Sequence, residues 1–261
     1  MKINANQILS INDGEGYADQ VRAFIARHWS ATHPIIDPSL FDWQYKGFGP
    51  LSDYSTFKVV VDGKGELKGF RGVIPGIYQV PAKGGYGIEF KNGGSGAMWM
   101  IEESLRGHGL GLQLFKTLEQ QCEVIVGLGS NIKSAIPFYK KNHFTILPAL
   151  RRYILPLNND LFSALCSQEI LSSNLKNWTS SIFPHFSKPA EPTNPTVEAL
   201  EVLWIQSTHP IQLFGLYRNR EFWKWRYKNS CGYQYFFLEI RLPKGSLWRI
   251  WIISIKRNSR N

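Results

Sequence analysis

One stretch near the middle of the chain, residues 97–122, restricts the fold more than any other. It begins with the apolar run AMWMI, whose length and aromatic content favour a strand. Two acids follow, and then the glycine turn RGHGLG at 106–111. Beyond the turn, apolar residues recur at every fourth position: Leu110, Leu114, Leu118 and Cys122. This spacing lines one face of a helix, so the stretch predicts a strand that passes through a glycine turn into an amphipathic helix.

The turn at 106–111 has the composition of an anion-binding turn. The first N–H groups of a helix have no intrahelical partner and carry the positive end of the helix dipole, which suits a phosphate group. Gly107, Gly109 and Gly111 let the backbone approach such an anion. No Lys followed by Ser or Thr comes after the last glycine, which excludes a P-loop, and the glycines do not fit GxGxxG. The turn fits RxxGxG, a pattern that an ordinary helix start fits equally well.

A second motif follows the first in order. After the helix, the sequence predicts a strand at 124–128, a turn containing Asn131, and a short helix ending in AIPFYKKN at 135–142. This series resembles the GCN5-related N-acetyltransferase (GNAT) family, in which RxxGxG holds the pyrophosphate of acetyl-CoA and a later A…FY segment supplies a tyrosine beside the sulfur. The resemblance covers about residues 15–153. It rests on both motifs being present, separated by one helix and one strand.

The resemblance implies a fold, a donor and a set of site residues. The expected fold is α/β (α+β), with a GNAT-like mixed sheet flanked by helices. Acetyl-CoA is the expected acyl-donor co-substrate, and an N–H of the strand before the turn polarises its thioester carbonyl. Tyr139 is expected to return a proton to the leaving thiolate, and Glu102 or Glu103 to take one from the acceptor amine, directly or through water. The residues expected to contact acetyl-CoA are Met100, Ile101, Arg106, Gly107, His108, Gly109, Leu110, Gly111 and Asn131.

Several of these residues have a structural explanation as well. Glu102 and Glu103 precede a helix start, where the dipole favours acids whatever their function. A tyrosine that follows Phe138 on a helix is half buried in many folds. Asn131 stands one residue further from Tyr139 than in the commonest family pattern, which leaves its role open.

The composition limits the partners of the chain. The formal charge of +10 makes a polyanion worth considering, but the basic residues form only small groups, which are more typical of a solvated surface than of a nucleic-acid stripe. We therefore do not expect nucleic acid. Three cysteines without metal-ligand spacing predict neither a disulfide framework nor a zinc site, and favour reduced thiols in the cytoplasm. No apolar run reaches the roughly 18 residues of a membrane span.

The residues before the central strand predict helices and a strand meander. A strand is expected at 7–11 and an amphipathic helix at 17–28. A short helix from Ser39 carries the aromatic residues of FDWQYK, and strands at 56–61 and 67–80 flank the turn DGKG. In the resembled family the first two helices wall the acceptor pocket. Two histidines in this part, His28 and His33, could face an acceptor, although no spacing supports them.

The composition changes in the last third of the chain. We expect an acetyltransferase domain at 1–155, a helix and Pro-rich linker at 156–195, and a partial second GNAT-like repeat at 196–261. The repeat is inferred because FDWQYK at 41–46 recurs as WKWRYK at 223–228, an offset of 182 residues. A six-residue echo also arises by chance. The segment at 196–261 is rich in aromatic residues that would expose a large apolar surface if left uncovered. We expect it to pack on the first domain.

The sequence leaves three classes of function open. The first is an N-acetyltransferase acting on a small-molecule amine, which by resemblance is an amino sugar of a bacterial surface polysaccharide; a homodimer is a candidate assembly. The second is a tandem-fold aminoacyltransferase that builds cell-wall peptide bridges, which the echo suits but which needs a groove between two complete copies. The third is a non-catalytic basic binding module, whose nucleic-acid binding would depend strongly on salt.

Overall fold

The structure of the chain is a computed structural model. It describes residues 6–84, 86–127, 133, 135–148, 192–207, 214–228, 231, 233–240 and 250–257. Two compact units make up the chain: Met1–Gly129 together with Thr193–Asn261, and Ser130–Pro192. The predicted helix at 161–171 and most of the predicted Pro-rich linker lie outside the described residues. Within the described ranges, the helices are too short or too polar to cross a membrane.

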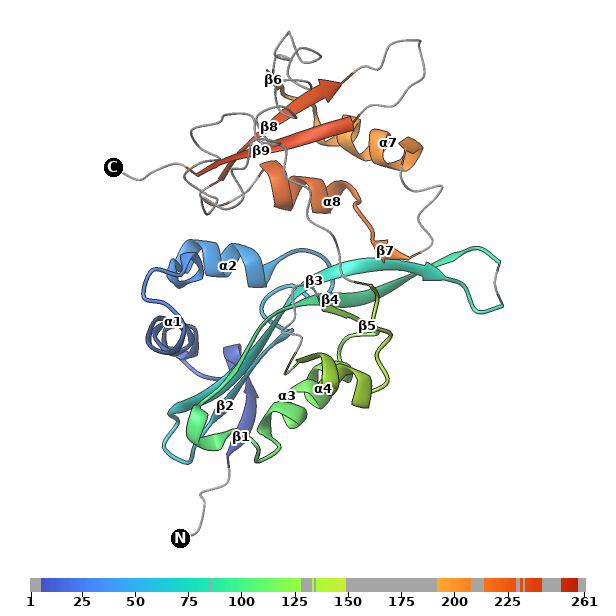
Figure 1. Cartoon of the computed structure of the whole chain (residues 1–261). Helices are drawn as coiled ribbons and strands as arrows, with labels where there is room; N and C mark the ends of the chain where they lie inside the picture. Colours follow the sequence, from blue (N-terminus) through green and yellow to red (C-terminus); the bar gives the residue numbers. More distant parts are fainter. Residues whose placement is uncertain are drawn as a thin grey trace, which may run out of the picture. The chain divides into compact units, whose positions relative to one another are not determined.

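A six-stranded mixed sheet forms the centre of the first unit (Figure 1). Its strands are β1 (Gln7–Ser10), β2 (Phe57–Val61), β3 (Leu67–Pro81), β4 (Ile88–Ile101), β5 (Val124–Gly127) and β7 (Gly215–Leu216). The order is β1-β2-β3-β4-β5, with β7 paired to the far part of β3. The pairs β1-β2, β2-β3 and β3-β4 are antiparallel, whereas β5 runs parallel to β4. This sheet, flanked by helices, confirms the predicted fold class.

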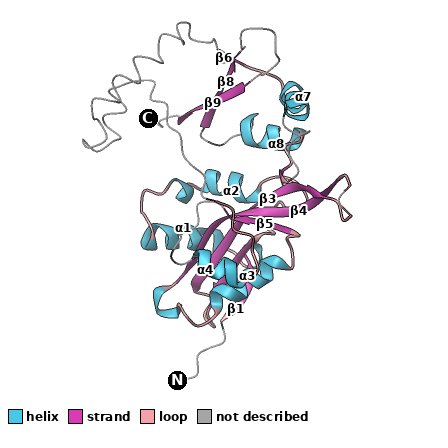
Figure 2. Cartoon of the chain, turned by 45° about the vertical axis from the view of Figure 1, so that its right-hand side comes forward, coloured by secondary structure: helices cyan, strands magenta, loops and turns pink. Residues whose placement is uncertain are grey.

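Helices cover both faces of the sheet (Figure 2). One face carries α1 (Tyr17–His28) and α2 (Pro38–Lys46), and the other carries α3 (Leu110–Glu119). Successive residues of a strand point to opposite faces, and β2 shows the consequence. Val59 belongs to the core under α1 and α2, while Val60 packs against Leu110 and Leu114 of α3. All five residues of β2 are buried as a result.

The helix α2 is held in place at its N-terminus and along its buried side. Asp37 caps it by accepting a hydrogen bond from the N–H of Leu40 at 3.0 Å, and Pro38 occupies the first helical position. Phe41 and Tyr45 are fully buried and pack with Phe57 of β2. Three short 3₁₀-helices connect the larger elements: η1 (Ile11–Asp13), η2 (Pro34–Ile36) and η3 (Glu103–Leu105).

The C-terminal residues contain further helices and a second sheet. The helices are α7 (Val197–Ser207), α8 (Arg220–Trp223) and the π-helix η7 (Lys224–Lys228). The second sheet has the order β6-β8-β9, formed by β6 (Pro192–Thr193), β8 (Tyr233–Ile240) and β9 (Ile250–Arg257). The strand β9 pairs antiparallel with β8.

The C-terminal helices pack on the first domain. Phe48, which follows α2, shares a buried cluster with Leu200, Trp204, Phe222 and Trp223. The strand β7 pairs with Tyr78 and Gln79 of β3, and thereby extends the main sheet. These contacts confirm the prediction that the aromatic tail docks on the preceding domain.

Two elements differ from the sequence prediction. The strand β4 begins at Ile88, nine residues before the expected start at Ala97, because the glycine-rich segment NGGSG at 92–96 is part of the strand and not a turn. A Cβ atom at Gly93 would lie 2.3 Å from the carbonyl oxygen of Val124, so glycine permits the close approach of β5. Among the described residues after α4 (Ala135–Lys141), residues 144–148 form no strand, although HFTIL predicts one.

Candidate active site

The strand β4 continues beyond the end of its parallel neighbour. Gly96 pairs with Gly127, the last residue of β5, while pairing with β3 continues to Ile101. The register against β3 shifts directly after Gly96, so Ala97 is an extra residue and forms a β-bulge. Along 97–101, no described strand pairs with the edge of β4 that faces β5. Residues 97–101 therefore extend β4 past the described pairing with β5, and an extended backbone of this kind can pair with a ligand that carries amide groups.

The glycine turn at 106–111 leads from β4 into α3. Gly107 and Gly109 have φ values of +83° and +84°, which glycine adopts far more readily than other residues, and Gly109 is the N-cap of α3. No heavy atom lies within 4 Å of a Cβ placed at either glycine, so the space around them is open. No side chain caps the helix, and the N–H groups of 107–112 donate to no backbone acceptor within the described residues. This arrangement suits a phosphate group.

The other residues of the predicted contact set surround this turn. The Nε atom of Arg106 donates to the carbonyl oxygen of Ile101 at 3.2 Å, and Nδ1 of His108 lies 3.1 Å from the carbonyl oxygen of Arg106. A Cβ at Gly111 would lie 3.0 Å from the ring of Trp99, so glycine brings the start of α3 close to β4. Leu110, the first residue of α3, is buried. Met100 and Ile101 pack against the cores on opposite faces of the sheet. Each residue therefore offers a ligand its backbone N–H and C=O groups and not its side chain.

The two predicted carboxylates lie beyond the end of β4. The carboxylate of Glu102 is 3.7 Å from Nζ of Lys68 and accepts a hydrogen bond from Oγ of Ser104 at 3.1 Å. Glu103 is 89% exposed and approaches Arg106 at 4.0 Å. Five residues of extended chain separate Glu102 from the bulge at Ala97, which corresponds to about 17 Å. Both acids therefore lie at the end of β4 next to the glycine turn.

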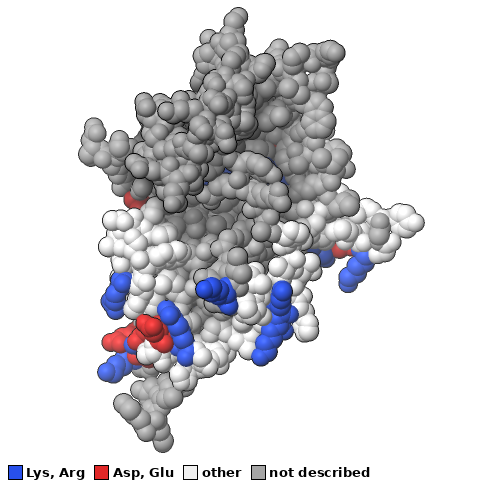
Figure 3. Space-filling model, in the orientation of Figure 1, with Lys and Arg blue, Asp and Glu red and all other residues white. Residues whose placement is uncertain are grey.

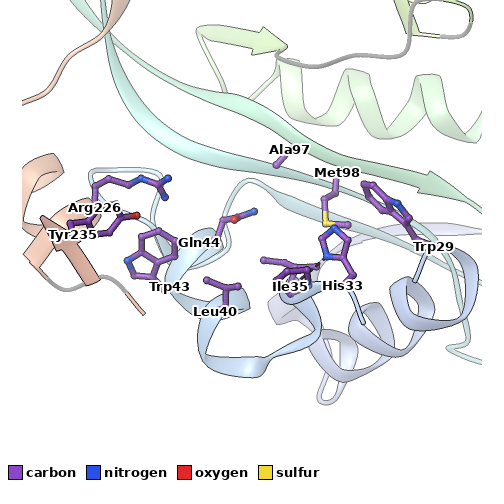
Figure 4. A pocket seen from close by; sticks show the side chains of 11 residues that line it. Trp29, His33, Ile35, Leu40, Trp43, Gln44, Ala97, Met98, Arg226 and Tyr235 are labelled. Carbon is purple, nitrogen blue, oxygen red and sulfur yellow. Dashed lines mark hydrogen bonds between the residues drawn. The ribbon is translucent and has the colours of Figure 1, made fainter. Parts of the chain in front are cut away.

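A pocket of about 410 Å³ opens beside the bulge of β4 (Figure 4). Its walls come from the end of α1, the segment leading into α2, α2 itself, β4 and the C-terminal segment. The residues that line it are Trp29, His33, Pro34, Ile35, Leu40, Trp43, Gln44, Ala97, Met98, Arg226 and Tyr235. The pocket thus lies between the first two helices and the bulge, where the resemblance predicts the acceptor.

The side chains of His33 and Trp43 are held by defined hydrogen bonds. Nδ1 of His33 accepts a hydrogen bond from the N–H of Ile35 at 3.2 Å, so in the neutral ring the proton is on Nε2. Trp43 donates from Nε1 to the carbonyl oxygen of Trp225 at 3.1 Å. His28, the other histidine considered from the sequence, is exposed at the end of α1 and does not line the pocket.

Tyr139 lies in α4, which belongs to the second unit. Its side chain is 8% exposed, and its ring centroid is 5.1 Å from that of Phe144. Asn131 lies outside the described residues. The roles predicted for Tyr139 and Asn131 therefore stay predictions.

The described residues offer no metal centre, and the thiol of Cys122 is not reactive. Among them, no group of three or more His, Cys, Asp or Glu side chains is placed to bind a metal ion. Cys122 is buried, and burial raises the pKa of its thiol to about 11, so the thiol is protonated at neutral pH. The arrangement that remains is the end of β4 with a glycine turn on one side and an aromatic pocket on the other.

Comparison with known proteins finds likeness at the level of structure. No protein-family model and no curated protein matches the chain. The similar solved structures include a proposed acetyl transferase from Pyrococcus furiosus, with 11% identity, a TM-score of 0.43, and coverage of 58% of this chain and 100% of that one. An acetyltransferase from Trypanosoma brucei has 18% identity, a TM-score of 0.39, and coverage of 58% and 99%. An aminoglycoside 6'-N-acetyltransferase from Acinetobacter baumannii has 8% identity, a TM-score of 0.41, and coverage of 59% and 100%.

These three structures belong to the class of enzyme that the two sequence motifs resemble. Their TM-scores lie below 0.5, so we base the functional argument on the geometry of the site and not on these matches.

Proposed function

We propose that the chain is an N-acetyltransferase that moves the acetyl group of acetyl-CoA to an amine. The observation that supports this proposal is the position of residues 97–101 of β4, which continue past the last pairing with β5 in the part of the chain that the structure describes. One end of this segment reaches the glycine turn at 106–111, and the other end is the bulge at Ala97, which lines the pocket. A donor held by its phosphates at the turn can thus extend along β4 to an acceptor in the pocket.

The residues present fit acetyl-CoA. The N–H groups of 107–112 would hold its pyrophosphate, because they start a helix and the space around Gly107 and Gly109 is open. The backbone edge at 97–101 would hold the amide-containing arm of the molecule. When bound, acetyl-CoA supplies an acetyl group that is already activated as a thioester.

The chain itself has little further chemistry to supply. We propose that an N–H of Trp99, Met100 or Ile101 donates to the oxygen on which negative charge develops, and that Tyr139 gives a proton to the departing thiolate. No carboxylate lines the pocket among the described residues. The ammonium of the acceptor therefore loses its proton to water, which is the route by which Glu102 or Glu103 could take it.

The acceptor that we propose is an amino sugar of a bacterial surface polysaccharide. The resemblance suggested this class, and the aromatic faces of Trp29 and Trp43 in the pocket agree with it. Among the residues that Figure 3 colours, basic side chains stand apart from one another and form no continuous stripe. This distribution does not favour a nucleic-acid-binding module. A cytoplasmic location and a homodimer remain predictions.

Acetyl transfer is tested by measuring the release of free thiol from acetyl-CoA. The whole chain is incubated with acetyl-CoA and a panel of amines that includes amino sugars, and thiol release is compared with that in reactions without an acceptor. We expect at least one amine to accelerate release and to appear as the N-acetyl product in mass spectra. Binding of acetyl-CoA without any product across a broad panel would leave a binding module as the better account.

One observation favours a second candidate, the tandem-fold aminoacyltransferase. The order of elements β1-α1-α2-β2-β3 recurs as β6-α7-β7-α8-β8-β9, with β7 as an additional strand between the two helices. Such an enzyme uses a donor other than acetyl-CoA, so failure of the chain to bind acetyl-CoA would favour it.

A further inference from the structure

The pocket is bordered by two segments whose contacts are reciprocal. Trp43 and Trp225 lie 182 residues apart, which is the offset of the sequence echo. Nε1 of Trp43 donates to the carbonyl oxygen of Trp225 at 3.1 Å, and Nε1 of Trp225 donates to the carbonyl oxygen of Trp43 at 2.8 Å. Their rings stack with centroids 5.2 Å apart. Contacts that are the same in both directions are characteristic of a two-fold relation between equivalent segments.

The same offset relates the starts of the two helices. Asp37 accepts a hydrogen bond from the N–H of Leu40, and Asn219, 182 positions later, accepts one from the N–H of Phe222; both bonds measure 3.0 Å. Asp and Asn are both good N-cap residues. The repeat therefore extends beyond the six-residue echo, in which three residues are identical, and residues at the same offset can be compared as equivalents.

Gln44 and Arg226 are such equivalents, and both line the pocket. The first segment thus contributes a neutral amide, whereas the second contributes a permanent cation at the corresponding place. Figure 4 shows Arg226 beside Trp43 at one end of the pocket, with His33 and Trp29 at the other end. Arg226 is carried by the π-helix η7, a geometry that is frequent at functional sites.

Among the described residues, aromatic rings and not carboxylates surround Arg226. Its guanidinium carbon lies 5.0 Å from the ring centroid of Trp43 and 6.0 Å from that of Trp225, which are cation–π contacts. Within the described part of the chain, no acidic residue lines the pocket and Arg226 makes no ion pair. An arginine held against aromatic rings with its donors toward a pocket recognises carboxylates and phosphates.

We propose that Arg226 binds an anionic group of the acceptor, so that the acceptors of this chain are amines that also carry a carboxylate or a phosphate monoester. The inference rests on the proposed function in one respect, namely that this pocket is the acceptor site. In this arrangement the anionic group lies against Arg226 and Trp43, and the amine lies toward Ala97 and Met98 of β4.

The proposal is tested by calorimetric titration of the whole chain with small aromatic probes. Benzoate and phenyl phosphate carry the two candidate anionic groups, and benzyl alcohol is their neutral counterpart. Each titration is run with and without saturating coenzyme A, so that an anion bound at the 106–111 turn is distinguished from one in the pocket. We expect at least one anionic probe to bind in the presence of coenzyme A, with an affinity that falls about tenfold or more in Arg226→Gln.

Two further variants complete the test. Glutamine is the residue at the equivalent position 44, so Arg226→Gln should fold, and an unchanged thermal unfolding midpoint checks this. Lys224→Gln removes the same charge from an exposed position on η7 and should leave anion binding unchanged. Arg226→Lys should recover part of the affinity. Benzyl alcohol should bind the parent and Arg226→Gln alike.

Two results would overturn the proposal: equal anion binding by the parent and Arg226→Gln, or no binding of either anion by the parent. Its failure is distinguishable from failure of the proposed function. If acetyl-CoA does not bind but anion binding still depends on Arg226, the acetyltransferase proposal fails and the anion site stands. If acetyl-CoA binds and anion binding does not depend on Arg226, only the acceptor inference fails.

Discussion

At the scale of single residues, the site depends more on backbone groups than on side chains. Met100 and Ile101 turn their side chains into the cores and leave their backbone edge open. Gly107 and Gly109 contribute N–H groups and open space. The sequence could predict these residues because RxxGxG specifies a backbone conformation. It could not predict Arg226, because nothing local to WKWRYK indicates that it lines a pocket formed with α2.

The two acids next to the turn give a direct test of this view. Glu102→Gln and Glu103→Gln should each leave kcat within about twofold of the parent, because both carboxylates lie at the phosphate end of the site. A general base typically contributes at least about a hundredfold. The turnover of each variant with a common amine is the measurement, and a hundredfold loss in either would restore that residue as the base.

The predicted role of Tyr139 implies the opposite result, a loss of kcat on substitution. Tyr139→Phe removes one hydroxyl group and keeps the ring, so we expect kcat to fall by about tenfold to a hundredfold while the affinity for acetyl-CoA stays within twofold. Tyr86→Phe makes the same change at a side chain that is 92% exposed, and serves as the control. A parent-like kcat in Tyr139→Phe would leave Tyr139 as a packing residue.

At the scale of elements, most helices and strands follow from local pattern. The helix α1 spans Tyr17–His28, the range predicted from its apolar spacing, since Val21, Phe24 and Ile25 are its buried residues. The early start of β4 could not be predicted, because a segment such as NGGSG is typical of a turn unless another backbone needs to approach it closely. The pocket could not be predicted as a whole, since its walls come from segments far apart in the sequence.

The hydrogen bonds of Asp42 on α2 predict that the stability of the fold depends on pH. Burial alone would raise the pKa of Asp42, but hydrogen bonds from Lys46 and Tyr54 lower it below its ordinary value near 3.8. Because the pKa is lower in the folded state, the stabilisation is present above pH 3.8 and is lost as the pH falls below it. Asp42→Asn should therefore unfold at a lower temperature than the parent at pH 7, and the difference should shrink below pH 4. A difference that is constant from pH 7 to pH 3 would contradict this assignment.

At the scale of the whole molecule, the C-terminal segment is part of the first unit and contributes to the pocket. Phe222 is 5% exposed and packs against Phe48, so Phe222→Ala should lower the free energy of unfolding by about 3–5 kcal/mol. Phe214→Ala changes a side chain that is 50% exposed and should have a much smaller effect. Denaturant unfolding of both variants checks this. Equal small effects would mean that the tail adds nothing to the stability of the domain.

The central claim is that the turn at 106–111 binds the phosphates of acetyl-CoA, and calorimetric titration of one matched pair of variants tests it most directly. Gly109 and Gly87 have φ values of +84° and +85°, and a Cβ at either meets no atom within 4 Å, so valine introduces similar backbone strain at both. We predict that the parent and Gly87→Val bind acetyl-CoA alike, while Gly109→Val binds it at least about tenfold more weakly, a difference of about 1.4 kcal/mol. Equal affinity of Gly109→Val and the parent would contradict the account.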